Sequence, residues 1–301
     1  MAISIETNIA SLTAQRQLTH TSNKLSTSME RLSSGKRINS AKDDAGGLAI
    51  TNRMEAQIRG INRSIQNLND ASSLVQIAAS GVAEVVDIVQ RIRELAVQGV
   101  NGTNTTNDRK AIYTELSQLA DQMDLLSGEG SKTGISMIKY NGMSLSDESV
   151  NSGNFSFQVG YEAGNTFTVG LADIDEIIDQ TVDNNSIDNI PGLNYSAAAF
   201  EDVIDKVDSA LSSQTSTNNT DQAGLLGVQA YLGSTLQRIE SMTANLYVQM
   251  ENTAASNSRI KDADIAKESA NLTSDNISRQ AGVAIMAQAN QQPQLVLQLL
   301  A

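Results

Sequence analysis

The sequence predicts a mainly α-helical protein, in which a long coiled-coil or bundle rod has paired N- and C-terminal helices and a small β-hairpin region. Three observations predict this fold class. Apolar residues recur at seven-residue steps over long stretches, only 2 prolines interrupt 301 residues, and both ends of the chain are nearly uncharged. The low aromatic content, 3%, also argues against the packed core of an ordinary globular enzyme.

The first expected helix runs from about residue 3 to residue 32. Large aliphatic residues recur along it mostly at steps of seven, the spacing of a coiled-coil seam that would drive assembly of the chain ends. These candidate seam positions are Ile5, Leu12, Leu18, Leu25 and Leu32. Glycines and short polar residues at 33–47 then predict a loop between helices.

A much longer helix is expected over residues 48–98, about 75 Å at 1.5 Å per residue. Its a positions run from Ile58 to Arg93 and its d positions from Ile61 to Ala96. Such a helix needs partners, and two further apolar periodicities supply them at 112–126 and 225–260. The turn-forming residues 99–107 allow the chain to reverse between the first two, so we expect a three-helix bundle.

Between the second and third bundle helices, two alternating apolar segments flank the turn sequence EAGN and predict a β-hairpin. They contain Phe155, Phe157, Val159 and Tyr161, then Phe167, Val169 and Leu171. Residues 173–221 are acidic and weakly patterned, apart from a short helical run at 200–211, and are expected to form a solvated, variable tip.

The charge distribution restricts the partners of the chain. Residues 141–221 hold fourteen acids against one base, Lys206, so this segment accounts for the net charge of −13. Such a segment repels nucleic acid and anionic membranes, and we expect neither as a partner.

The sequence contains few residues of the types that catalyse reactions or bind metals and cofactors. There is no cysteine, and His20 is the only histidine. The sequence GEGSKTG at 128–134 has Ser131 where a phosphate loop requires glycine, and the acids of 173–188 lack the spacing of a calcium loop. We therefore expect no catalytic residue, no metal site and no cofactor.

Arg91 and Leu95 lie one helical turn apart, away from the expected seam of the long helix. One interpretation is an exposed contact patch formed by both side chains. The other is that Leu95 packs under the adjacent helix, which contains Glu115. The spacing alone favours neither.

Five motifs together resemble bacterial flagellin: RLSSGKRINSAKDDAGGLAI at 31–50, VQRIRELAVQ at 89–98, LQRIESMTANL at 236–246, SRIKDADIAKE at 258–268 and QAGVAIMAQANQQPQLVLQLL at 280–300. The resemblance implies three domains. Residues 1–42 with 262–301 would form a terminal coiled coil lining the filament channel, 43–172 with 222–261 the surrounding helical tube with its hairpin, and 173–221 a short variable surface region.

The resemblance also implies a function: self-assembly into the extracellular flagellar filament for swimming, after unfolded export through the flagellar type III apparatus without a cleaved signal peptide. Expected partners are further copies of the chain, an export chaperone, and the cap and hook-associated proteins. Toll-like receptor 5 would contact the monomer at Arg91, Leu95 and Glu115, residues that would also contact a neighbouring subunit. Inflammasome sensors would read Leu297, Leu299 and Leu300, whose first role is in the channel wall.

Two alternatives stay open at this point. A hook–filament junction protein has similar ends but usually matches the RINSAKDDAGG segment less well. An enzyme displayed on a filament would need a catalytic constellation within 141–221, where the sequence has no histidine, no cysteine and one base.

Overall fold

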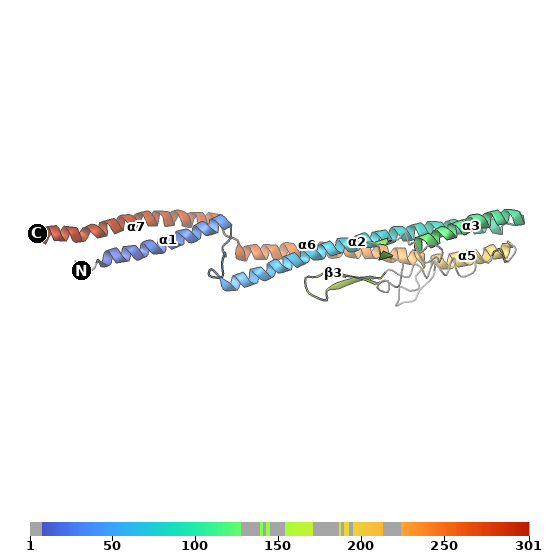
Figure 1. Ribbon diagram of the computed structural model, residues 1–301, viewed down its shortest axis with the longest axis horizontal. Helices are drawn as coiled ribbons and strands as arrows, with labels where there is room; N and C mark the ends of the chain where they lie inside the picture. Colours follow the sequence, from blue (N-terminus) through green and yellow to red (C-terminus); the bar gives the residue numbers. More distant parts are fainter. Residues whose placement is uncertain are drawn as a thin grey trace. The chain divides into compact units, whose positions relative to one another are not determined.

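The computed structural model describes residues 8–127, 139–140, 143–144, 154–170, 187, 190–192, 195–212 and 224–300, with side chains in the last helix as far as residue 291. The helices are α1 (Ile9–Ser34), α2 (Ala45–Val100), α3 (Thr106–Ser127), α5 (Ala197–Ser212), α6 (Leu225–Lys261) and α7 (Ile265–Leu300) (Figure 1). The strands are β1 (Lys139–Tyr140), β2 (Met143–Ser144), β3 (Asn154–Gln158) and β4 (Thr166–Gly170). The predicted fold class, long helices with a small antiparallel hairpin, is confirmed.

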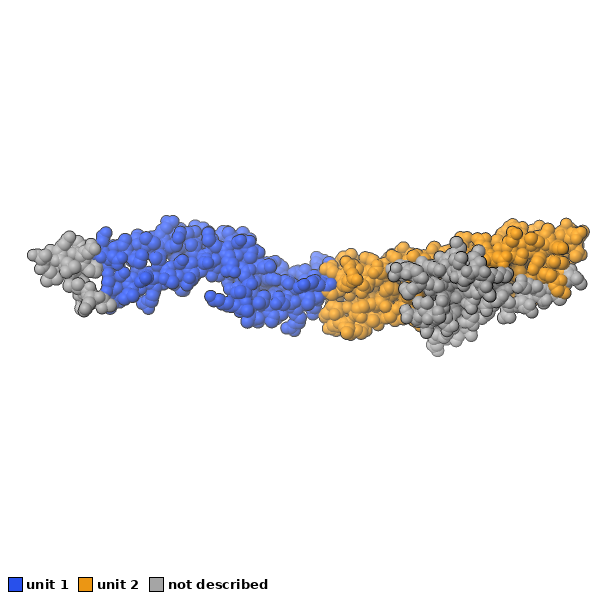
Figure 2. Space-filling model, in the orientation of Figure 1, with its two compact units in different colours: residues 1–59, 250–301 blue, residues 60–249 orange. Residues whose placement is uncertain are grey.

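The chain divides into two compact units, coloured separately in Figure 2. The first contains residues 1–59 and 250–301, and within it α1 lies beside α7 (Figure 1). The second contains residues 60–249 and holds α3, α5 and the hairpins. Helices α2 and α6 contribute residues to both units.

Short polar residues and one glycine set the helix ends around the first unit. The side chain of Asn8 accepts a hydrogen bond from the Ser11 amide at 3.0 Å, which caps the start of α1. Gly35 ends α1 in the left-handed conformation, with φ 69°, where a glycine has no Cβ to clash. Asp44 and Asp264 cap α2 and α7 through their side-chain oxygens.

The core of the second unit follows the predicted heptads. Every d position of α2 between Ile61 and Ala96 is buried. The helix partners contribute Leu116 and Met123 from α3, and Leu232 and Ile239 from α6. By length and composition α2 contains a stretch apolar enough to cross a membrane, and most of its valines and isoleucines between Val75 and Ile92 are here in the core of the bundle.

The hairpin of β3 and β4 is confirmed, with the predicted turn at its tip. Phe155 pairs with Val169 and Phe157 with Phe167 across the antiparallel register. Polar contacts hold the hairpin on the helices: the Asn67 side chain donates to the Gln158 carbonyl at 2.8 Å, the Gly170 amide donates to the Tyr231 hydroxyl at 3.3 Å, and the Arg238 guanidinium lies 4.9 Å from the Phe167 ring centroid. Leu171 lies outside the described residues.

The expectation that residues 173–221 form a solvated tip is wrong for α5. Its apolar residues recur at helical spacing and are buried in the bundle core: Ala199, Phe200, Val203, Val207 and Ala210. Phe200 occupies a notch at Gly99 of α2, where an added methyl group would come within 2.4 Å of its ring. Arg93 of α2 donates to Asp208 at 2.6 Å, and this ion pair joins the C-terminal half of α5 to α2.

Candidate functional site

The terminal helices α1 and α7 pack antiparallel to each other, because Ser28 meets Glu268 whereas Asn8 meets Ala289. Their Cα atoms approach within 8 Å of one another. Small residues make this approach possible: Thr21, Ser28 and Ala289 are buried, and a methyl group added at Gly282 would lie 3.5 Å from a methyl carbon of Leu18. This is the pairing of the two chain ends that the resemblance implied.

The predicted seam of α1 needs one correction. Leu18, Leu25 and Leu32 are half-buried, but Leu12 is 53% exposed. The step from Leu12 to Leu18 is six residues, which rotates Leu12 off the row that faces α7, and Ser11 takes its place there. The prediction is therefore wrong for Leu12 as a contact of this helix pair. Ile5 lies outside the described residues.

The outer surface of this helix pair is unusually apolar. Seven large apolar side chains on it are each at least half exposed. They are Ile9, Leu12 and Met29 on α1, and Ile265, Ile277, Val283 and Ile285 on α7. Single exposed apolar residues are normal, but so many on two paired helices indicate a surface that other protein covers.

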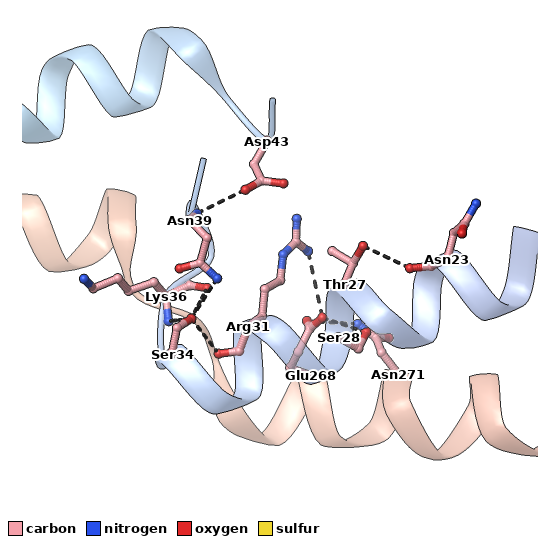
Figure 3. Close-up of polar contacts among 10 residues, drawn as sticks. All are labelled: Asn23, Thr27, Ser28, Arg31, Ser34, Lys36, Asn39, Asp43, Glu268 and Asn271. Carbon is pink, nitrogen blue, oxygen red and sulfur yellow. Dashed lines mark hydrogen bonds and ion pairs between the residues drawn. The ribbon is translucent and has the colours of Figure 1, made fainter. Parts of the chain in front are cut away.

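A buried polar cluster lies between the two helices near the end of α1 (Figure 3). Glu268 of α7 is 8% exposed and accepts a hydrogen bond from the Ser28 hydroxyl at 2.8 Å. The Arg31 guanidinium lies 3.9 Å from the same carboxylate, and Asn271 donates to its second oxygen at 3.3 Å. The buried charge is therefore hydrogen-bonded and paired, as burial of a carboxylate requires.

Next to this cluster, the chain segments that leave α1 and α6 are joined by a backbone clasp, defined here as residues 35–37 and 260–263. The Arg37 amide donates to the Lys261 carbonyl at 2.7 Å, and the Ala263 amide to the Gly35 carbonyl at 2.9 Å. The Arg37 guanidinium also donates twice to the Ile260 carbonyl, at 2.7 and 3.2 Å. An arginine at these last carbonyls also suits the negative end of the α6 dipole.

Two carboxylates support the same region electrostatically. Backbone hydrogen bonds from Ser40 and Asn39 lower the pKa of Asp43, which holds the loop after the clasp (Figure 3). A hydrogen bond from Lys261 lowers the pKa of Glu55 and joins the first turns of α2 to the end of α6. Neither Glu268 nor the clasp was singled out from the sequence, since their roles depend on partners more than 200 residues away.

On the second unit, Arg91 and Glu115 meet across α2 and α3. Arg91 donates to Glu115 at 2.8 Å and to Glu94 at 3.0 Å, and each of these side chains is at least half exposed. These hydrogen bonds, that to Glu115 first, raise the pKa of the Arg91 guanidinium. The pair forms a small charged surface with both ends accessible.

Leu95 does not share that surface, since it is 2% exposed and belongs to the same core cluster as Ile112 and Leu116 of α3. Of the two interpretations left open by the spacing, packing against the adjacent helix is therefore the one observed. The physical reason is that α2 has neighbours on more than one side, so buried positions extend beyond a and d.

Other predicted positions have limited or no structural description. Helix α7 continues to Leu300, and so includes Leu297, Leu299 and Leu300, but their side chains lie beyond the described ones. Within the described part of the chain, no group of three or more His, Cys, Asp or Glu residues is arranged to hold a metal ion.

Comparisons with known proteins place the chain in a family. Residues 5–147 match the bacterial flagellin N-terminal helical region, and residues 204–300 match the C-terminal helical region. The chain is 37% identical to a flagellin of Halalkalibacterium halodurans over 98% of its length and 99% of that protein, and 35% identical to a flagellin of Bacillus subtilis with the same coverage. A crystal structure of Bacillus cereus flagellin matches with a TM-score of 0.45 and 24% identity, covering 64% of this chain and 94% of that one. The chain belongs to the bacterial flagellin family, the structural subunits of the extracellular flagellar filament.

Proposed function

We propose that this chain polymerises through the outer surface of the α1–α7 pair, which becomes the coiled-coil interior of a swimming filament. The observation that supports the proposal is the set of seven apolar side chains, each at least half exposed, on the outside of that pair. Full burial of one such side chain contributes about 1.5 to 3 kcal/mol. Further copies of the chain, each with the same surface, would provide that burial. Leu12 would then be buried at the contact between subunits.

The decisive experiment compares two substitutions on α7. Ile277→Asp with Ile285→Asp places charges on the apolar outer surface, whereas Gln280→Asp with Gln288→Asp adds the same charge at exposed polar positions of the same helix. Electron microscopy after addition of ammonium sulfate, which favours apolar burial, should show filaments for the control and none for the isoleucine variant. Normal filaments from both would refute assembly through this surface.

We also propose that Toll-like receptor 5 recognises the monomer through Arg91 and Glu115. The exposed ion pair across α2 and α3 supports this, because an arginine with accessible donors is a frequent hot spot in interfaces. Leu95 would contribute by holding α2 and α3 together beneath the pair, as its burial suggests.

Receptor activation is best tested with Arg91→Ala and with Glu115→Ala, using Arg93→Ala as the matched control. Arg93 is exposed, ion-paired and on the same helix, but its partner Asp208 is on α5. Arg91→Ala should weaken receptor activation in reporter cells by about thirtyfold, the effect of losing about 2 kcal/mol at a hot spot. Equal activation by all three variants would remove Arg91 and Glu115 from the receptor site.

Three further roles complete the proposal. The chain would be exported unfolded by the flagellar type III apparatus, and its lack of cysteine means that no disulfide has to be reduced beforehand. An export chaperone, the cap and the hook-associated proteins would be its partners in export and assembly.

Inflammasome sensors would bind Leu297, Leu299 and Leu300. Alanine at these three positions should reduce sensor activation, while Gln298→Ala should leave it unchanged.

A further inference from the structure

The contacts between α1 and α7 follow one heptad register along both helices. On α7, Glu268, Asp275, Gly282 and Ala289 recur every seven residues, and all four are buried or half-buried. On α1, the corresponding positions run in the opposite direction, starting from Ser28, which meets Glu268. The contacts of Gly282 with Leu18 and of Ala289 with Asn8 continue the same alignment toward the far ends.

The leucines of α1 do not define this register by themselves. Leu18, Leu25 and Leu32 are seven residues apart and are all half-buried. If α1 slid by one heptad along α7, each leucine would move into the place of the next, and little apolar contact would change. A repeated apolar seam permits such slippage, whereas a buried polar residue with one matching partner opposes it.

The polar positions match in two consecutive heptads. In the first, Glu268 accepts from Ser28 and lies near Arg31, three residues further along α1. Seven residues away on each helix, Asp275 is half-buried and Thr21 is buried at the equivalent place, with Lys24 three residues further along. Each acid of α7 is thus aligned with a hydroxyl and a base of α1.

Either one-heptad slip breaks this match. In one direction Glu268 moves to Thr21, but Asp275 then faces Ala14, which has no hydrogen-bond donor in its side chain. In the other direction Asp275 moves to Ser28, but Glu268 then faces Gly35, beyond the end of α1. Burial of a carboxylate without a partner is disfavoured, and only the observed register places a hydroxyl of α1 opposite both acids.

We propose that Glu268 and Asp275 form a two-step polar ladder with Ser28/Arg31 and Thr21/Lys24, and that this ladder selects the register in which α1 pairs with α7. These six side chains act as positioning residues. The ladder specifies one alignment, and the adjacent clasp holds together the two chain crossings beside it. The proposal does not depend on receptor recognition or on export.

The absence of cysteine from the sequence allows the register to be measured directly on the full chain. Leu18→Cys with Gly282→Cys reports the observed register, because a Cβ atom added at Gly282 would lie 3.5 Å from a methyl carbon of Leu18. Ser11→Cys with Gly282→Cys, and Leu25→Cys with Gly282→Cys, report slips of one heptad in the two directions. In a glutathione buffer the disulfides exchange, and peptide mass spectrometry of the monomer gives the linked fraction for each pair.

The three cysteine pairs are combined with two ladder variants and one clasp variant. Glu268→Leu with Asp275→Leu removes both acids but keeps apolar bulk, so the helix pair should keep its helix content while the slipped pairs link at least about tenfold more than in the parent chain. Glu268→Gln with Asp275→Asn retains hydrogen-bond acceptors and should restore most of the preference. Arg37→Ala, which removes two hydrogen bonds of the clasp, should leave the distribution unchanged.

Two results would overturn the proposal. One is a leucine variant whose links stay confined to Leu18→Cys/Gly282→Cys, as in the parent chain. The other is slippage that appears in Arg37→Ala but not in the leucine variant, which would assign register selection to the clasp. A tenfold change in linked fraction corresponds to about 1.4 kcal/mol between registers.

Discussion

Truncating Leu95 should destabilise the second unit strongly, although this residue lies next to an exposed charged pair. Leu95 is 2% exposed and belongs to the core that includes Leu116. Leu→Ala substitutions at such sites cost about 2 to 5 kcal/mol, the range reflecting how far the surroundings collapse into the cavity. For a unit of this size, about 2 to 4 °C is lost per kcal/mol, so Leu95→Ala should lower the melting temperature by about 4 to 20 °C.

Circular dichroism melting of the full chain measures this effect, with two controls on the same helix. Leu95→Met keeps the buried volume and should cost less than about 1.5 kcal/mol. Val97→Ala removes a side chain that is 50% exposed and should change stability by about 0.5 kcal/mol or less. If Leu95→Ala melted like Val97→Ala, Leu95 would not be a core residue, and its direct availability to a receptor would have to be considered again.

Three further predictions follow from local geometry. Gly99→Ala should destabilise the docking of α5, because the added methyl group would come within 2.4 Å of the buried Phe200 ring, and hydrogen exchange of the α5 amides should accelerate. Gly35→Ala should cost about 1 to 2 kcal/mol in urea unfolding, since only the backbone strain at φ 69° changes and the site has open space around it. Glu55→Gln should reduce stability at pH 7, and this deficit should shrink as pH falls below 4.5, because the Lys261 hydrogen bond lowers the pKa of Glu55 from its ordinary 4.5 and the resulting stability is lost as pH falls through that lowered value; a deficit that stays equal at all pH values would contradict it.

The heptad pattern of the sequence was sufficient to predict the long helices and the main seam of α2. Positions such as Leu68, Val75 and Val82 are fully buried, and each was assigned from spacing alone. The hairpin was equally predictable, because alternation and turn chemistry are local signals. In both cases the residues that determine the structure are close together in the sequence.

The features that the sequence did not predict depend on residues of other helices, which the periodicity of a single helix does not reveal. Leu95 looked like an off-seam residue because a heptad describes one interface, whereas α2 is enclosed from several sides. The helical run of α5 was recognised, but not its burial, since that requires the notch at Gly99, about a hundred residues earlier. Glu268 looked like an ordinary acid until the fold placed Ser28 beside it.

The terminal helix pair distributes polarity in the opposite way to a stable coiled coil in water. Its interior contains a carboxylate, hydroxyls and small residues beside half-buried leucines, while seven large apolar side chains lie outside. Each of these is at least half exposed, so complete burial would release about half of its 1.5 to 3 kcal/mol, or about 5 to 10 kcal/mol for all seven. The half-buried leucines of α1 supply apolar contacts within the pair. A further large part of the apolar stabilisation available to α1 and α7 therefore depends on covering their outer surface.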